Sequence, residues 1–231
     1  MKTKGAPFID IHTHHASSAM TFGVHPWWLD TVIASEAKQS NLIRLESLLK
    51  ENKIAAIGET GIDRLHKATL RLQIEVFEKH ILLSEQYRKP LIIHNVRGTD
   101  EILRLHKKHQ PKQPWIIHGF NGNAAEAQLF TEKGIYLSVG ESLFYENRKV
   151  TKAITSIPLD HLFLETDTSE KTIQEVYEKA AERLNLPLEV LKERIFANFA
   201  RLNLDVWNSG TTEHDCSSAT MGLRSLDGAM C

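Results

Sequence analysis

The stretch PLIIHNVRG, residues 90–98, decides the fold of this 231-residue chain. Its apolar run is typical of a buried strand and ends in His94, and a glycine follows four residues later. Four other apolar segments end in residue types that bind metals: FIDIHTH in His12 and His14, IAAIGET in Glu59, WIIHG in His118 and LFLETD in Asp167. Buried parallel strands read as continuous apolar runs, and barrels gather catalytic groups at the carboxyl ends of their strands. The pattern therefore predicts an α/β barrel with metal chemistry at one rim.

Helical periodicity alternates with these strands. Leu70, Ile74, Phe77 and Ile81 recur three to four residues apart, which predicts a long amphipathic helix. The chain has a length at which one α/β barrel can form a single domain, so residues 1–204 are predicted to be one domain. Residues 205–231 are rich in Ser, Thr and Gly without an apolar period, and we expect a disordered tail there.

The second βα unit of the barrel is expected to be incomplete or distorted. Thr21–His25 is predicted to be a strand, which Pro26 ends. The segment between His14 and Thr21 is shorter than the dozen or so residues that a parallel crossover normally requires. The sequence therefore predicts seven strands and not eight.

Composition excludes several classes of protein. The charges of the 28 basic and 29 acidic residues nearly cancel, so the protein has no overall electrostatic field that would attract nucleic acid or anionic lipid. No apolar run approaches the roughly 20 residues of a membrane span, and no segment suggests an obligate protein partner. Both cysteines, Cys216 and Cys231, lie in the final stretch, so we expect no disulfide framework and a cytoplasmic location.

Six residues at the strand ends form a candidate ligand set of four imidazoles and two carboxylates. The set suits zinc, manganese, magnesium or a similar divalent ion, and it could hold two ions if one carboxylate bridges them. His12 and His14 lie two residues apart on a strand and therefore share a face. The alternative is that each histidine only satisfies a hydrogen bond in a loop. The candidate ligands are His12, His14, Glu59, His94, His118 and Asp167.

In chain order, the segments FIDIHTH, GVHPW, AIGETGID, PLIIHNVRG, IIHGFNG and LFLETD resemble the successive motifs of the TatD-type metal-dependent hydrolases. That family belongs to the amidohydrolase-like superfamily, and the resemblance runs from about Phe8 to Phe199. The resemblance implies a TIM-type barrel and a metal-dependent hydrolase that cleaves ester bonds in DNA. The motif ETDTSE departs from the family's ETDAPY-like ending, and HGFNG departs from HCFSG.

The resemblance also implies roles for single residues. His12, His14 and Asp167 would hold a first ion, His94 and His118 a second, and Glu59 would bridge the two. Asp167 and Glu59 are the predicted catalytic residues, with Asp167 as the proton acceptor for an attacking water. The predicted substrate contacts are His25, Arg97, Phe120 and Asn121.

Three functions remain open at the level of sequence. The first is a phosphodiesterase or deoxyribonuclease, whose substrate is DNA or a small phosphodiester. The second is an amidohydrolase acting on a small amide, lactone or cyclic imide, because the same ions would polarise a carbonyl group. The third is a degenerate barrel without turnover, which the shortened second unit suggests.

Overall fold

The computed structural model describes residues 5–14, 19–29, 34–202, 204 and 220–225. Eight strands form one parallel sheet in the order β1-β8-β2-β3-β4-β5-β6-β7. The strands are β1 (Phe8–Thr13), β2 (Ala19–Phe22), β3 (Ala56–Asp63), β4 (Leu91–Val96), β5 (Trp115–Ile117), β6 (Tyr136–Val139), β7 (Leu162–Leu164) and β8 (Thr220–Ser225).

The two edge strands of this sheet, β1 and β7, meet and close it into a barrel. Thr13 forms an isolated parallel bridge with Asp167, which lies just beyond β7. The backbone N–H of Asp167 donates to the carbonyl of His12, and the N–H of His14 donates to the carbonyl of Asp167, each at 3.0 Å. The predicted TIM-type barrel is confirmed. Its parallel strands place their carboxyl ends at one rim.

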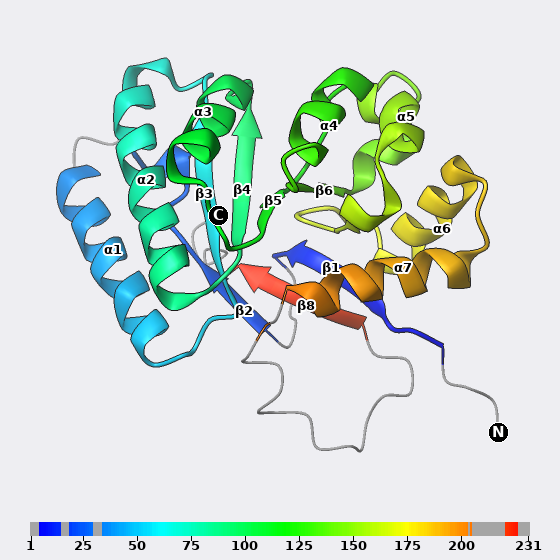
Figure 1. Ribbon diagram of the computed structural model, residues 1–231, viewed down its shortest axis with the longest axis horizontal. Helices are drawn as coiled ribbons and strands as arrows, with labels where there is room; N and C mark the ends of the chain where they lie inside the picture. Colours follow the sequence, from blue (N-terminus) through cyan, green and yellow to red (C-terminus); the bar gives the residue numbers. More distant parts are fainter. Residues whose placement is uncertain (1–4, 15–18, 30–33, 203, 205–219, 226–231) are drawn as a thin grey trace.

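Helices lie outside the strands, with α1, α2 and α3 on one side of the view in Figure 1 and α4 to α7 on the other. The α-helices are α1 (Ala34–Lys50), α2 (Leu70–Tyr87), α3 (Thr99–His109), α4 (Ala124–Thr131), α5 (Lys149–Ala153), α6 (Ile173–Leu184) and α7 (Leu188–Arg201). Short 3-10 turns are η1 (Pro26–Leu29), η2 (Lys67–Thr69), η3 (Glu141–Phe144), η4 (Ile154–Ser156) and η5 (Leu159–His161). Among the residues that the structure describes, no helix has the length and apolar content needed to cross a bilayer.

The core lies between these helices and the strands. Every residue of β3 is buried, as are Leu91, Ile92 and Ile93 of β4. The predicted amphipathic helix is α2, whose Phe77 and Ile81 are fully buried against this core. Strands that are buried on both faces have no polar side to reveal an alternation, which is why they read as apolar runs.

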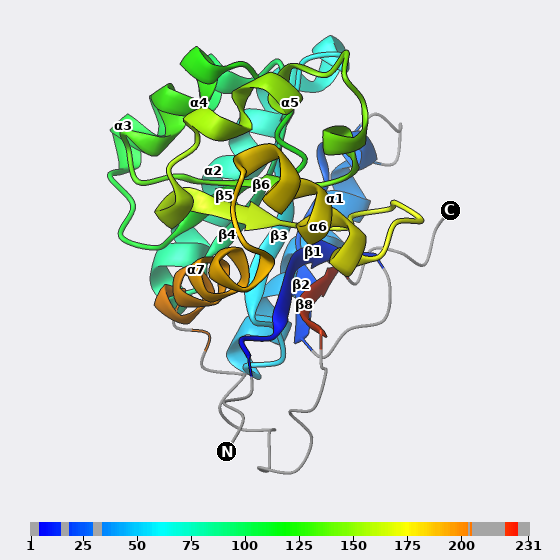
Figure 2. The ribbon, with the colours of Figure 1, turned by 90° about the vertical axis from the view of Figure 1, so that its right-hand side faces the viewer.

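The expected disordered tail is wrong for Thr220–Ser225, because these residues form β8. This strand lies between β1 and β2 and pairs in parallel with both (Figures 1 and 2). The described residues therefore form a barrel of eight strands, where the sequence predicted seven. The composition of the segment did not reveal this, because a strand can be held by backbone pairing to two neighbours. Residues 205–219 and 226–231 lie outside the described residues, and the domain boundary at residue 204 stays a prediction.

The short connection between β1 and β2 is explained by the register of β8. Phe8 pairs with Thr220 and Thr13 with Arg224 on one side of β8. On the other side, Ala19 pairs with Leu223, so β2 begins high along the barrel, close to the level at which β1 ends. Among the described residues, no helix lies between β1 and β2.

Candidate metal centre

The carboxylate of Glu59 lies at the centre of a histidine cluster. Its Oε1 is 3.1 Å from Nε2 of His12 and 3.1 Å from Nε2 of His14. Asp167 Oδ1 approaches the same two nitrogens, at 3.7 Å and 3.4 Å. One donor atom from each of these four residues lies within 4.8 Å of the others. This first group unites β1, β3 and the end of β7.

A second group surrounds the other carboxylate oxygen of Glu59. Oε2 is 2.8 Å from Nε2 of His118, 3.4 Å from Nε2 of His25 and 3.7 Å from Nδ1 of His94. Nδ1 of His94 lies 3.3 Å from the Nε2 atoms of both His25 and His118. The structure thus brings together all six predicted ligands, and Glu59 is the residue that the two groups share.

His25 has a different part in this second group. The backbone N–H of Trp27 donates to Nδ1 of His25 at 3.2 Å. Nδ1 therefore has no proton, and in the neutral imidazole the proton is on Nε2. Nε2 faces Glu59 and His94, so His25 suits a hydrogen-bond donor better than a metal ligand. The predicted contact of His25 with the substrate stays a prediction.

Two glycines let β3 carry Glu59 past its neighbour β4. A Cβ atom at Gly61 would lie 2.2 Å from the carbonyl oxygen of His94, and one at Gly58 would lie 2.6 Å from Cβ of Ile92. The φ angle is 138° at Gly61 and 157° at Gly58, and residues other than glycine rarely adopt such values. The close approach of β3 and β4 at this point brings Glu59 and His94 to the same cavity.

Asp167 is held at the rim by its backbone. Its φ of 51° lies in the left-handed region, which is uncommon for a residue other than glycine. Its N–H is bonded to His12 of β1 and its carbonyl to His14, which follows β1, as described for the closure of the barrel. Such strain in a non-glycine residue is frequent at functional sites, where the surrounding structure imposes it.

The charges of the cluster are strongly coupled. Burial penalises charge on both His12 and Glu59, but their mutual attraction outweighs it for this pair. The carboxylate of Glu59 raises the pKa of His12 to about 9. His118 and His12 together hold the pKa of Glu59 well below its usual range. Burial lowers the pKa of His118, which favours the neutral imidazole that a metal requires.

The donor set fits divalent metal ions. Nδ1 of His94 and Nε2 of His118 face each other at 3.3 Å, and the carboxylates of Glu59 and Asp167 complete a set that also includes His12 and His14. Lone pairs that converge in this way repel one another unless protons or a cation lie between them. Imidazole nitrogens and carboxylate oxygens are the donors that zinc and similar ions prefer.

An outer layer of carboxylates supports the ligands, and sequence analysis assigned it no function. Asp63 Oδ2 lies 3.5 Å from Nε2 of His94, on the side of the ring that faces away from Glu59. Asp10 is buried and accepts bonds from the backbone N–H and hydroxyl of Thr166, at 3.0 Å and 2.7 Å. Carboxylates that orient ligating histidines are common around metals. The signal was available, because Asp63 and Asp10 share strand faces with Glu59 and His12.

Glu165 belongs to the same layer. It is buried, and its Oε1 accepts the N–H of Gly119, which follows His118. Burial raises the pKa of Glu165 to about 8. The bond to Gly119 ties the end of β7 to the loop after β5, and so fixes the distance between their ligands.

The predicted substrate contacts lie in different surroundings. Arg97 is exposed directly after β4, and Asn121 is half-buried, with an Oδ1 that has no partner among the described residues. Phe120 is only 3% exposed and packs edge to face on Phe130, 6.4 Å between ring centroids. The prediction of a substrate contact is therefore wrong for Phe120, because its side chain belongs to the core.

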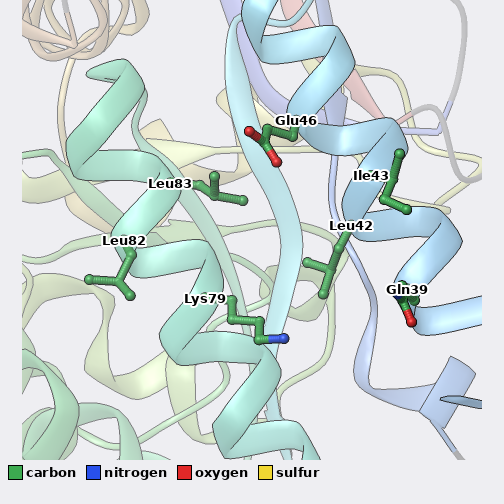
Figure 3. Close-up of a pocket in the computed structure, with 7 residues that line it drawn as sticks. All are labelled: Gln39, Leu42, Ile43, Glu46, Lys79, Leu82 and Leu83. Atoms are coloured by element: carbon green, nitrogen blue, oxygen red, sulfur yellow. The ribbon is translucent and has the colours of Figure 1, made fainter.

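A separate hollow lies between α1 and α2 (Figure 3). Two of its apolar side chains, Ile43 and Leu82, are exposed, and its only charged groups are Glu46 and Lys79. None of the clustered histidines lines it. It is lined by Gln39, Leu42, Ile43, Glu46, Lys79, Leu82 and Leu83. The chemistry of the protein is therefore expected at the histidine cluster and not in this hollow.

Comparison with known proteins agrees with this geometry. The chain is 27% identical over 201 residues to an uncharacterized metal-dependent hydrolase of Haemophilus influenzae, with 78% of this chain and 75% of the relative covered. A 3'-5' ssDNA/RNA exonuclease TatD of Klebsiella pneumoniae is 27% identical over 76% of this chain and 66% of its own length. Several other relatives are matched over only about half of their length.

The fold has solved counterparts as well. The crystal structure of YjjV, a TatD homologue from Escherichia coli, superposes with a TM-score of 0.66 at 24% identity, and covers 80% of this chain and 76% of its own. The family model described as TatD related DNase matches residues 9–203, which contain every residue of the histidine cluster. This chain therefore belongs to the TatD-related DNase family of metal-dependent hydrolases.

Proposed function

We propose that this protein is a phosphodiesterase that uses two divalent metal ions to hydrolyse single-stranded nucleic acid, with DNA as the expected substrate. The observation that supports this most is the position of Glu59, whose two oxygens face two separate groups of donors. One relative is named as a 3'-5' ssDNA/RNA exonuclease, which favours a nucleic acid over a small amide.

The ligands divide between the two oxygens of Glu59. His12, His14 and Asp167 would hold one ion, and His94 and His118 would hold the other. When bound, two such ions supply a nucleophilic water near neutral pH and neutralise charge on a phosphate group. Glu59 keeps both groups together and excludes solvent between them, since its side chain is only 7% exposed.

Asp167 is the best candidate for the proton acceptor. Its side chain is 37% exposed, so it can exchange a proton with bulk water, whereas Glu59 is enclosed by five imidazoles. A general base must lie within hydrogen-bond reach of the proton that it removes. Asp167 meets this condition for a water held beside His12 and His14.

His25, Arg97 and Asn121 would contact the substrate. Nε2–H of His25 points into the cluster and can donate to a phosphate oxygen. Arg97 follows β4 three residues beyond His94, and its guanidinium suits a bidentate contact with phosphate. Asn121 lies in the loop after β5, and its Oδ1 is an acceptor without a hydrogen-bond partner among the described residues.

A substrate panel tests the proposal. Bis-p-nitrophenyl phosphate, single-stranded DNA, single-stranded RNA and simple amides are compared with manganese, zinc or magnesium added, and again after chelation. We expect metal-dependent cleavage of the phosphodiesters and of DNA. Turnover of amides alone would mean an amidohydrolase, and no turnover in any arm would mean a barrel without catalysis.

The panel includes two matched variants. Glu59→Gln, purified in the same way, shows whether a contaminating nuclease contributes to the measured rates. His161→Ala removes a partly exposed histidine that pairs with Asp160 outside the cluster, and it should cleave like the parent.

The cytoplasmic location stays a prediction.

A further inference from the structure

Trp27 is an exposed aromatic side chain at the edge of the histidine cluster. It is 55% exposed, although tryptophan is usually well covered in a folded protein. Its ring centroid lies 4.9 Å from that of His25 and 5.9 Å from that of His94, with the planes near perpendicular in both pairs. The indole thus touches the site on one part and faces solvent with the rest.

The indole is fixed in this position. Its Nε1–H donates to Oδ2 of Asp63 at 2.7 Å, and its backbone N–H donates to His25. Asp63 also accepts the N–H of Leu65, so the carboxylate cannot turn away from the indole without losing a second bond. A ring that is held rigidly while exposed loses little conformational entropy when a ligand covers it.

The surroundings of Trp27 combine aromatic and basic side chains. The ring of His66 lies 6.1 Å from the indole with an angle of 37° between their planes. Arg64 and Lys67 stand in the same loop after β3, and Leu65 is 62% exposed. Aromatic faces beside cations are the usual platform for single-stranded nucleic acid, because bases stack while the backbone is neutralised.

From this arrangement we propose that Trp27 stacks on the nucleobase next to the scissile phosphate, and so makes the site selective for single-stranded nucleic acid over other phosphodiesters. The inference rests on the proposed phosphodiesterase function. Because the indole contacts His94 directly, a base stacked on it belongs to a nucleotide adjoining the phosphate at the cluster. His66 extends the same platform away from the metal centre.

The test compares two substrates and three variants. The substrates are a ten-residue thymidine oligonucleotide and an abasic oligomer of the same length, so that only the bases differ. The variants are Trp27→Leu, Trp27→Phe and the control Phe196→Leu, which alters an exposed aromatic residue on α7. Binding is measured by fluorescence anisotropy without turnover, cleavage by KM and kcat, and metal content by elemental analysis.

Stacking predicts that the penalty of Trp27→Leu is larger for the thymidine oligomer than for the abasic one, by roughly 5- to 150-fold in Kd and KM. Trp27→Phe should restore part of this difference, and Phe196→Leu should show none. Equal penalties on both oligomers would mean that Trp27 only shields His94, and no penalty on either would also overturn the proposal.

The two proposals fail in different ways. If the parent cleaves the abasic oligomer as well as the thymidine oligomer and binds both equally, stacking is refuted and the phosphodiesterase stands. If the parent cleaves neither oligomer but hydrolyses an amide, the proposed function is refuted. In that case fluorescence anisotropy still tests the stacking proposal, because a parent protein that binds the thymidine oligomer no better than the abasic oligomer does not stack a base on Trp27.

Discussion

Two parts of the barrel contribute candidate metal ligands but differ in how their strands are connected: a regular side from β3 to β7, and an irregular side formed by β1, β8 and β2. From β3 to β7 each strand is joined to the next through a helical segment, and each neighbour in the sheet is the neighbour in sequence. On the other side, the part of the chain that the structure describes has no helix between β1 and β2, and β8 lies between these two strands in the sheet. Nevertheless, His12 and His14 of the irregular side lie 3.1 Å from a carboxylate oxygen of Glu59, compared with 2.8 Å for His118 of the regular side.

This difference separates two requirements of the site. The ligands need a strand end at the correct place on the rim, and a crossover helix is not required to provide it. Each strand does need hydrogen-bonded neighbours, because unpaired backbone groups in a buried sheet are costly. In this protein, β8 provides those neighbours for β1 and β2.

The largest effect is expected where the two sides meet, at Glu59. Glu59→Gln keeps the size of the side chain but removes the charge that all five surrounding histidines face. We expect both ions to be lost and hydrolysis to fall by more than about four decades, beyond the contribution of a general base alone. Elemental analysis after dialysis and cleavage of bis-p-nitrophenyl phosphate measure the two losses.

The matched control is Glu78→Gln, because Glu78 pairs with Lys108 and His109 between α2 and α3, outside the cluster. It should leave metal content unchanged. A Glu59→Gln protein that retains two ions would show that the two groups are held independently.

Variants of Asp167 and His94 allow a comparison between the place where β1 meets the end of β7 and the regular side of the barrel. Asp167→Asn removes a ligand charge and the proposed proton acceptor, whereas His94→Ala removes only a ligand of the other ion. We expect Asp167→Asn to stay folded and to lose hydrolysis by more than the roughly two to four decades of a general base. High metal concentration should restore His94→Ala better than Asp167→Asn. Equal and complete restoration of both would mean that Asp167 only holds metal.

Removal of residues 205–231 tests the irregular side directly. If β8 completes the barrel, the truncated chain exposes the strand edges of β1 and β2, and β1 carries Ile9 and Ile11, which are fully buried in the intact protein. We expect a loss of about 3 kcal/mol in the free energy of unfolding, which corresponds to a fall of roughly 6–12 °C in Tm for a chain of this size. Thermal unfolding followed by circular dichroism measures it, and an unchanged Tm would mean that the segment is a tail, as its composition indicates.

The sequence predicted the regular side of the barrel, from β3 to β7, better than the irregular side formed by β1, β8 and β2. The regular side was predictable because buried strands and amphipathic helices have distinct periods, and because ligand types at the strand ends share a rim. Thr220–Ser225 could not be predicted, since nothing in a polar segment indicates which distant strands it pairs with. Phe120 was misplaced because a residue beside a ligand can face either the cavity or the core. Asp63 shares a strand face with Glu59, which the sequence could have revealed, but its position beside His94 depends on how β3 and β4 pair.

His80 on α2 joins the two sides and gives the smallest predicted effect. It is fully buried, its Nδ1 donates to the carbonyl of Val76 at 2.7 Å, and its Nε2 accepts the N–H of Val24 at 3.1 Å. The contact with Val24 requires the neutral ring, because a proton on Nε2 would face the Val24 N–H. Burial lowers the pKa of His80 to about 4. The segment that leads to His25 is thus attached to α2 by an imidazole that must stay uncharged.

The consequence is a pH dependence of stability with a defined sign. From about pH 7.5 upward His80 is neutral in both the folded and the unfolded chain, so it contributes no pH dependence there. As the pH falls from about 6.5 to 4, the unfolded chain takes up the proton first, and stability decreases by up to about 3 kcal/mol. In His80→Gln, whose amide oxygen can still accept the Val24 N–H, this part of the decrease should be absent. Urea unfolding at pH 7, 5.5 and 4.5 measures the difference, with His161→Gln as the exposed control. Parallel curves for the parent and His80→Gln would mean that His80 titrates normally in the fold, and that the attachment of the irregular side to α2 tolerates a charge.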